Sequence, residues 1–143
     1  MICRYKIKEI GNFFGGLTGK SKEDFDNGNA RYVSYMTVFS NYQLPNVISD
    51  TVTISENEKQ NRIKKGDILF TGSSETPDEC GMSCVVTKDV DDNVYLNSFC
   101  FGFHIDNKEL AYPPYFSYYV SSTPFRKFIY PFAQGSTRFN LCK

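Results

Sequence analysis

An apolar segment runs directly into a small polar loop in the stretch Lys64-Lys65-Gly66-Asp67-Ile68-Leu69-Phe70-Thr71-Gly72-Ser73-Ser74-Glu75-Thr76. Residues 68–70 favour β-structure and do not alternate with polar residues, so they predict a strand buried on both faces. Turn residues stand at both of its ends. The hydroxyls and amides of 71–74 could donate to phosphates or base edges, and Gly72 would allow a close approach. An ordinary solvated loop after a capped strand fits the same residues.

The residues on both sides of this stretch predict further strands and two helices near the C-terminus. Strand-like runs occur at 5–10, 31–35, 51–54, 82–87, 93–97 and 99–103, the first with room for a short turn of helix. Short helical turns are expected at 21–25 and 36–41. Apolar residues at helical spacing predict helices near 113–120 and 124–133, the second with Thr123 as cap and Pro124 at its first position. Segment 15–20 is expected to be a flexible loop, and its glycines lack P-loop spacing.

Length and composition indicate one globular domain over residues 1–143. A chain of 143 residues can bury a core without metals or disulfides. The apolar fraction of 41% and the aromatic fraction of 16% exclude a disordered chain. No apolar run reaches membrane-spanning length, and the N-terminus lacks the layout of a signal peptide. We therefore expect a cytoplasmic protein without a membrane partner.

The cysteine pattern argues against disulfides, a metal site and cysteine catalysis. The five cysteines, at 3, 80, 84, 100 and 142, are an odd set without a paired C-x-x-C motif. Cys80 and Cys84 could form half of a zinc site, but the only histidine, His104, brings no second ligand pair. We expect buried free thiols, no metal and no cofactor. With one histidine available, no acid-base or nucleophile constellation stands out.

Charge is balanced overall but unevenly distributed. The formal net charge is zero, with an excess of basic residues in 1–22 and no acid at all in 110–143. Acidic residues gather between these ends, interrupted by Arg62, Lys64 and Lys65. A fold that brings both termini together would have a basic face suited to a phosphate backbone. Scattered surface charge is the other interpretation of the same pattern.

Several motifs occur together in an order that resembles a known family. They are Lys65-Gly66-Asp67-Ile68-Leu69 with its Ser/Thr loop and Gly81, Tyr115-Phe116-Ser117-Tyr118-Tyr119, Phe125-Arg126, and Ala133-Gln134-Gly135-Ser136-Thr137-Arg138-Phe139-Asn140. Together they resemble the target recognition domain of type I restriction-modification specificity subunits. The resemblance spans nearly the whole chain.

This resemblance implies a fold and a function. The fold would be α/β (α+β), a single domain with a twisted, mostly antiparallel sheet and a few short helices. The domain would read one half of a bipartite site in double-stranded DNA and direct the methyltransferase (modification) and restriction subunits. It would not be an enzyme, since methylation and cleavage belong to those subunits. A typical specificity subunit has two such domains joined by long helical spacers, and this chain shows no heptad-like segment.

Two sets of residues are candidates for contact with DNA. Basic side chains suit phosphates, and here they are Lys20, Lys22, Arg126 and Lys127. Hydroxyl and guanidinium groups suit the grooves, and here they belong to Ser73, Ser74, Thr76, Ser136, Thr137 and Arg138. Since no acid lies between Ala111 and Lys143, we expect Arg138 to face DNA and not a local salt bridge. A long-range pair with an acid of the middle region is the structural alternative.

Two other classes of function fit the sequence. A truncated remnant could act as a protein-interaction or inhibitory module for methyltransferase subunits, and the balanced charge and missing spacers favour this alternative. A small enzyme is the third class, although reaction roles need convergent titratable groups that the chain scarcely supplies.

Overall fold

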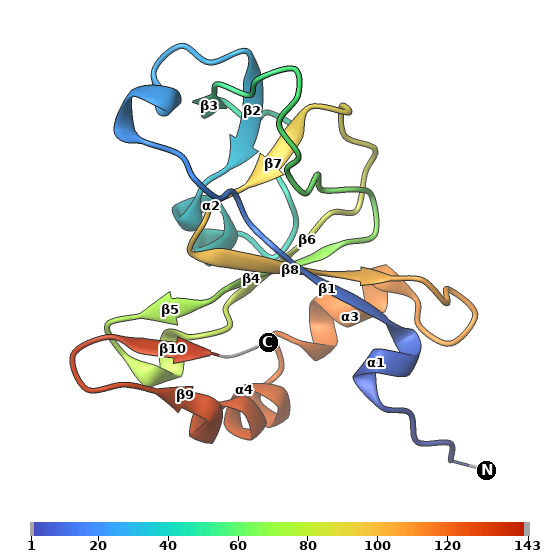
Figure 1. Cartoon of the computed structure of the whole chain (residues 1–143). Coiled ribbons are helices and arrows are strands. Elements are labelled where there is room, and N and C mark those ends of the chain that lie inside the picture. Colours follow the sequence, from blue (N-terminus) through green and yellow to red (C-terminus); the bar gives the residue numbers. More distant parts are fainter. Residues whose placement is uncertain (1, 142–143) are drawn as a thin grey trace.

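Three small sheets and four short α-helices make up residues 2–141, the part of the chain that the computed structural model describes (Figure 1). The central sheet has the order β1 (Gly11–Gly15), β8 (Cys100–Ile105), β4 (Ile68–Thr71) and β6 (Ser83–Val85). All of its neighbouring strands are antiparallel. Strand β4 is buried at every residue, which confirms the double-sided burial predicted from its sequence.

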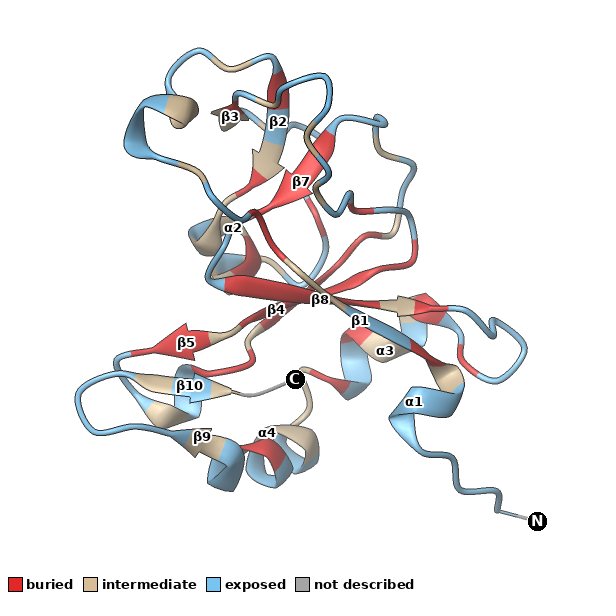
Figure 2. Cartoon of the chain, in the orientation of Figure 1, coloured by how far each residue is buried: buried red, intermediate tan, exposed pale blue. Residues whose placement is uncertain are grey.

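The central sheet separates two apolar clusters, and β4 contributes to both. Leu69 packs with Val33, Val38 and Leu96 on one face. Ile68 and Phe70, which alternate with Leu69, pack on the other face with residues such as Phe101, Phe103 and Val120. Both faces of the strand are therefore covered, and none of its residues faces solvent. Figure 2 shows the resulting band of buried residues through the middle of the molecule.

A second sheet forms the upper lobe in Figure 1. Its order is β3 (Thr51–Val52), β2 (Ala30–Val33) and β7 (Val94–Leu96), with β2 antiparallel to β3 and parallel to β7. The 3₁₀ turn η1 (Lys22–Phe25) and helix α2 (Tyr35–Ser40) accompany it, close to the helical turns expected at 21–25 and 36–41.

The third sheet lies at the opposite end of the molecule, beside the C-terminal helices (Figure 1). It has the order β5 (Ser73–Ser74), β10 (Phe139–Leu141) and β9 (Ala133–Gln134). Around it are η2 (Pro77–Glu79), α4 (Thr123–Ile129) and η3 (Tyr130–Phe132). Helix α1 (Ile7–Ile10) and helix α3 (Pro113–Tyr119) lie nearer β1 and the central sheet.

The structure corrects three of the expected elements. Residues 7–10 are helical because the Glu9 carboxylate accepts the Lys6 backbone N–H at 2.6 Å, and the strand begins at Gly11 instead. The last helix ends at Ile129, before β9, and its N-cap is Ser122, one residue earlier than expected. Ser73 and Ser74, expected in a loop, form a buried strand because they pair with Asn140 and Phe139 far along the chain.

Candidate functional site

The loop 135–138, which joins β9 to β10, places its polar side chains at the surface. Ser136, Thr137 and Arg138 are all exposed. Gly135 has a φ of +153°, and a Cβ at this position would lie 2.0 Å from the Arg138 backbone oxygen. The loop therefore closes this tightly only with glycine at its first position. We call residues 135–138 the hairpin loop.

Arg138 is held by two contacts that leave most of its guanidinium free. Its Nε donates to Ser73 Oγ at 3.2 Å, and its Cζ lies 5.4 Å from the centroid of the Phe99 ring. Such cation–π contacts orient a guanidinium without neutralising it. Within residues 2–141, Arg138 forms no salt bridge. The arginine is thus positioned but keeps its charge and its terminal N–H groups for a ligand.

The serines of β5 support the hairpin loop from below. Ser73 is 4% exposed, and its backbone oxygen accepts the Tyr35 hydroxyl at 2.7 Å. Ser74 is 5% exposed and donates through Oγ to Glu79 Oε2 at 3.1 Å. Its Oγ also accepts the backbone N–H of Thr76, which is exposed. Ser73 and Ser74 are therefore within reach of Arg138 and Thr76 but are themselves covered.

The two predicted basic residues of α4 differ in their surroundings. The guanidinium of Arg126 donates to the backbone oxygen of Asp78, and its Nη1 is buried without a partner in the described part of the chain. Burial lowers the pKa of Arg126, with the nearby Cys80 and Asp78 opposing this shift. Lys127 is exposed. Arg126 links α4 to η2, whereas Lys127 is available to a ligand.

The two predicted lysines of the upper lobe also differ. Lys20 Nζ lies 2.6 Å from Glu58 Oε2 and 2.7 Å from the Thr53 backbone oxygen, and its side chain is 9% exposed. Hydrogen bonds from Lys20, Gln60 and the Ser55 N–H lower the pKa of Glu58 to about 2. Lys22, in η1, is exposed. Lys20 therefore joins two segments of the upper lobe, whereas Lys22 is exposed and available to a ligand.

The structure gathers six of the ten predicted site residues around the hairpin loop. These are Ser73, Ser74, Thr76, Ser136, Thr137 and Arg138. Lys20 is bonded to Thr53 and Glu58, and Lys22 belongs to η1 beside β3, so both lie in the other lobe. Phe99 and Tyr35, which help to hold this cluster, were not predicted, because neither stands beside a motif in the sequence.

The comparisons with known proteins agree with this architecture. The family model described as "Type I restriction modification DNA specificity domain" matches residues 4–142. The chain belongs to this family. The suspected membership is therefore confirmed, and with it the association with DNA and with restriction-modification systems that the family's description states. No curated protein matches the chain.

A solved structure has a similar fold. It is the S subunit of a type I restriction-modification system from M. genitalium, with a TM-score of 0.57 and 16% sequence identity. The match covers 96% of this chain and 30% of that subunit, so the chain spans about a third of its length. A second match, from a study of type I R-M complex assembly and conformational transition, has a TM-score of 0.44 and 14% identity over 83% of this chain and 28% of that one. The match to the M. genitalium subunit confirms the mixed α/β fold with antiparallel sheets and short helices.

Two further observations concern membrane-spanning helices and metal sites. No helix within residues 2–141 has the length and apolar character needed to cross a bilayer. In the same range, no group of three or more His, Cys, Asp or Glu side chains is arranged to hold a metal ion. The absence of zinc at Cys80 and Cys84 stays a prediction.

Proposed function

We propose that residues 1–143 act as one recognition domain that reads one half of a bipartite site in double-stranded DNA. The observation that carries this proposal is the exposed guanidinium of Arg138, oriented by Ser73 and Phe99 and unpaired with any carboxylate in the described residues. A positioned arginine binds guanine through two parallel hydrogen bonds in the major groove. Membership of the DNA specificity family supports the choice of DNA as ligand.

The hairpin loop would supply base contacts and the exposed lysines would supply phosphate contacts. Ser136 and Thr137 can donate to or accept from base edges on either side of Arg138. Lys22 and Lys127 are exposed and would fix the domain on the backbone. Lys20 and Arg126 would support the fold from within, because Lys20 Nζ is bonded to Glu58 and Thr53 and Arg126 Nη2 is bonded to the Asp78 backbone oxygen.

The chemistry on DNA would be left to other subunits. The residues gathered at the hairpin loop are hydroxyls, an arginine and an aromatic ring, which position a ligand but supply no general base. The domain would direct the methyltransferase and restriction subunits by fixing their register on the sequence. An enzyme that modifies a base must take it out of the stack, and this step would belong to the methyltransferase.

Selection from a pool of randomised DNA duplexes tests this function. The chain should enrich a short defined sequence, and the variant Ser136→Ala/Thr137→Ala/Arg138→Ala should lose preference at some of those positions. Arg4→Ala is the control, since Arg4 is an exposed arginine near the N-terminus and away from the hairpin loop. Equal enrichment by the wild type and the hairpin variant, or no enrichment by the wild type, would refute the proposal.

A further inference from the structure

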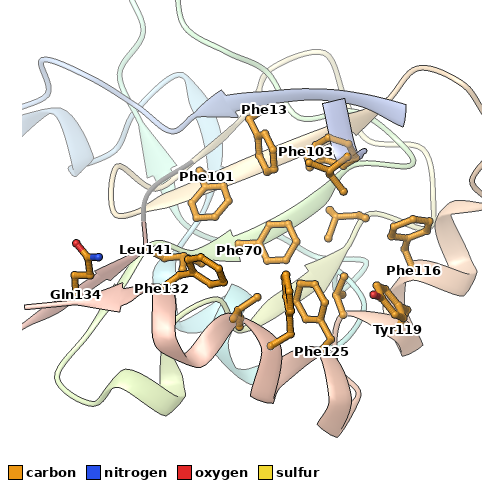
Figure 3. A pocket seen from close by; sticks show the side chains of 15 residues that line it. Phe13, Phe70, Phe101, Phe103, Phe116, Tyr119, Phe125, Phe132, Gln134 and Leu141 are labelled. Carbon is orange, nitrogen blue, oxygen red and sulfur yellow. The ribbon is translucent and has the colours of Figure 1, made fainter. Parts of the chain in front are cut away.

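An apolar groove opens between the central sheet and the C-terminal helices. Phe13, Phe70 and Phe101 form its sheet side, and Phe125, Phe128 and Phe132 form its helix side. Figure 3 shows the rings of Phe13, Phe70 and Phe101 on one side and those of Phe125 and Phe132 on the other, with Gln134 at one end. The groove has a volume of about 360 Å³. Among its lining side chains, only Gln134 and the Tyr119 hydroxyl carry polar atoms.

The groove exists because one face of the central sheet is incompletely covered. The upper lobe packs over the other face and buries it. Helices α3 and α4 cover only part of the face that holds Phe70 and Phe101, and Phe13 stays 39% exposed on the outer strand β1. Across the gap, Phe128 is 66% exposed and Phe132 is 56% exposed. Contiguous apolar surface of this kind marks an interaction site.

The shape of the groove selects a helix as its occupant. Its walls are almost entirely apolar side chains, which match the apolar stripe of an amphipathic helix more closely than the alternating face of an added strand. A helix lying beside α4 on the sheet would complete the helical layer of a two-layer α/β arrangement. The rings of the sheet side are already packed together, with centroids 4.8 Å apart for Phe13 and Phe103 and 5.2 Å for Phe70 and Phe101. They form a fixed surface on which apolar side chains can pack.

The charges beside the groove select an acidic occupant. Lys6 and Lys8 flank the lining residue Ile7, and Lys127 precedes the lining residue Phe128. Glu9 is engaged by the Lys6 backbone N–H. No acidic residue occurs between 111 and 143. The apolar lining offers nothing to a phosphate backbone, and a flat anionic membrane would not enter a concave groove.

We propose that this groove binds an amphipathic α-helix of a partner protein, with its apolar stripe on the phenylalanines and acidic residues along its flanks. This inference goes beyond the DNA-reading role and uses a different surface from the hairpin loop. Anchors at positions i, i+3, i+4 and i+7 of the helix would meet the rings. The lysines would then pair with the acidic flanks at the rim and favour this orientation.

A fluorescent peptide is the probe for this surface. It is a helix of about 18 residues with a leucine stripe and glutamates on its flanks, long enough for roughly five turns. The comparison peptides have the same composition in scrambled order, or lysine in place of glutamate. Fluorescence anisotropy should show binding of the glutamate peptide about tenfold tighter than either comparison peptide.

Variants of exposed residues identify the binding surface. Phe128→Glu should weaken binding of the glutamate peptide about tenfold, and Phe132→Ser should do the same if Phe128→Glu fails to fold. Val47→Glu is the matched control, because Val47 is 80% exposed in the other lobe. Replacing Lys6 and Lys8 with glutamate, which leaves the proposed phosphate contact Lys127 in place, should reverse the preference toward the lysine peptide.

Four results would overturn the proposal. They are equal binding of all three peptides, unchanged binding by both groove variants, concentration-dependent dimers that Phe128→Glu abolishes, and binding to anionic lipid vesicles that Phe128→Glu abolishes. The last two would assign the groove to a second copy or to a membrane. DNA selection by Phe128→Glu should match that of the wild type, so failure here would leave the proposed DNA function standing.

Discussion

The imidazole Nδ1 of His104 lies 2.5 Å from Oδ1 of Asp67, a carboxylate that is almost completely buried at the start of β4. The second carboxylate oxygen of Asp67 accepts the backbone N–H of Lys64 at 2.7 Å. Loss of solvation on burial raises the pKa of Asp67 above its ordinary value of 3.8, although both hydrogen bonds act in the opposite direction. The only histidine of the chain thus serves the fold, by satisfying a carboxylate that the central sheet encloses.

This raised pKa predicts how stability changes with pH. Because the folded protein holds the Asp67 proton more tightly than the unfolded chain, the contribution is fully present below 3.8 and is lost as pH rises through the raised pKa. It amounts to about 1.4 kcal/mol for each unit by which the pKa is raised. Asp67→Asn should remove this decline in the free energy of unfolding. Urea titrations between about pH 4 and 7, the range above the ordinary carboxylate pKa, measure it.

The neighbours of Asp67 require a control. His104 contacts it directly, and Asp106 Oδ1 lies 3.8 Å from His104 Nε2. The same comparison is therefore made in a His104→Gln background, which removes the imidazole beside Asp67. Parallel stability curves for the aspartate and asparagine proteins in both backgrounds would show that Asp67 does not titrate in this range.

Arg138→Ala should weaken DNA binding and leave the fold intact. The expected loss is about 1–3 kcal/mol if Arg138 reads a base, and a salt dependence shallower by about one unit of slope if it holds a phosphate. Arg138→Lys should not restore a base contact, because an ammonium lacks the paired donors of a guanidinium. Stability should barely change, since the side chain is exposed and makes one hydrogen bond. Titrations at several salt concentrations and a thermal melt measure both quantities.

Lys127→Ala is the companion variant for a pure phosphate contact. It should reduce the salt slope without changing the preferred sequence. Unaltered DNA affinity of Arg138→Ala together with a large fall in melting temperature would mean that Arg138 is structural and that the recognition surface lies elsewhere.

Variants of Lys20 and Lys22 should have different effects, the first on stability and the second on DNA binding. Lys20→Met should lower the melting temperature, because it removes the hydrogen bonds from Lys20 to Glu58 and to the Thr53 oxygen. The stability that Glu58 contributes is present above pH 4.5 and is lost as pH falls toward its pKa of about 2. Because Lys20 is the first cause of this lowered pKa, Lys20→Met should reduce the loss of unfolding free energy at low pH. Lys22→Met should change neither property but should reduce the salt slope of DNA binding. Identical behaviour of the two variants in both assays would contradict these assignments.

Local sequence was sufficient to predict the elements whose structure depends on residues nearby in the chain. The unbroken run Ile68-Leu69-Phe70 predicted a strand covered on both faces, and helical spacing with Pro124 predicted α4. Strands that pair with a distant part of the sequence could not be predicted from their own residues. Ser73 and Ser74 have the composition of a loop and become a strand only because β10 arrives beside them.

In the candidate site, too, local sequence predicted some features and missed those that depend on distant contacts. The order Gly135-Ser136-Thr137-Arg138 indicated an exposed loop, and the structure has one there. Charge along the chain could not reveal which cations the fold itself uses. Lys20 and Lys22 look alike in sequence, yet only Lys20 reaches Glu58 from a distant segment. Phe99 could not be predicted as a site residue from the sequence, because its contact with Arg138 joins two turns that are far apart in the chain.

The buried thiols should resist modification in the folded protein. Burial raises the pKa of Cys84 and of Cys100 to about 12, and it also raises the pKa of Cys80. Cys3 is exposed, and Cys142 lies outside the described residues. Iodoacetamide labelling followed by peptide mass spectrometry should modify Cys3 quickly and the three buried thiols only at the rate of unfolding. Rapid labelling of Cys84, or stoichiometric zinc in protein purified without added metal, would contradict this assignment.

Gly135→Ala should disable the hairpin loop while leaving most of the fold in place. The added Cβ would lie 2.0 Å from the Arg138 backbone oxygen, so the loop must open and carry Arg138 away from Ser73 and Phe99. The two central clusters lie elsewhere and should keep their packing. We expect loss of sequence preference in duplex selection with a smaller effect on the thermal melt.

Gly19→Ala is the matched control for this last variant. Gly19 also has a positive φ, of +66°, but a Cβ there would meet nothing within 4 Å. Its cost should be the backbone strain alone, about 1–2 kcal/mol of stability, because the left-handed region disfavours alanine. DNA selection should be unchanged, since Gly19 adjoins Lys20, whose bonds to Thr53 and Glu58 place this segment in the upper lobe, away from the hairpin loop. If Gly135→Ala selected the same sequence with the same affinity as Gly19→Ala, the shape of the hairpin loop would not determine which DNA the domain reads.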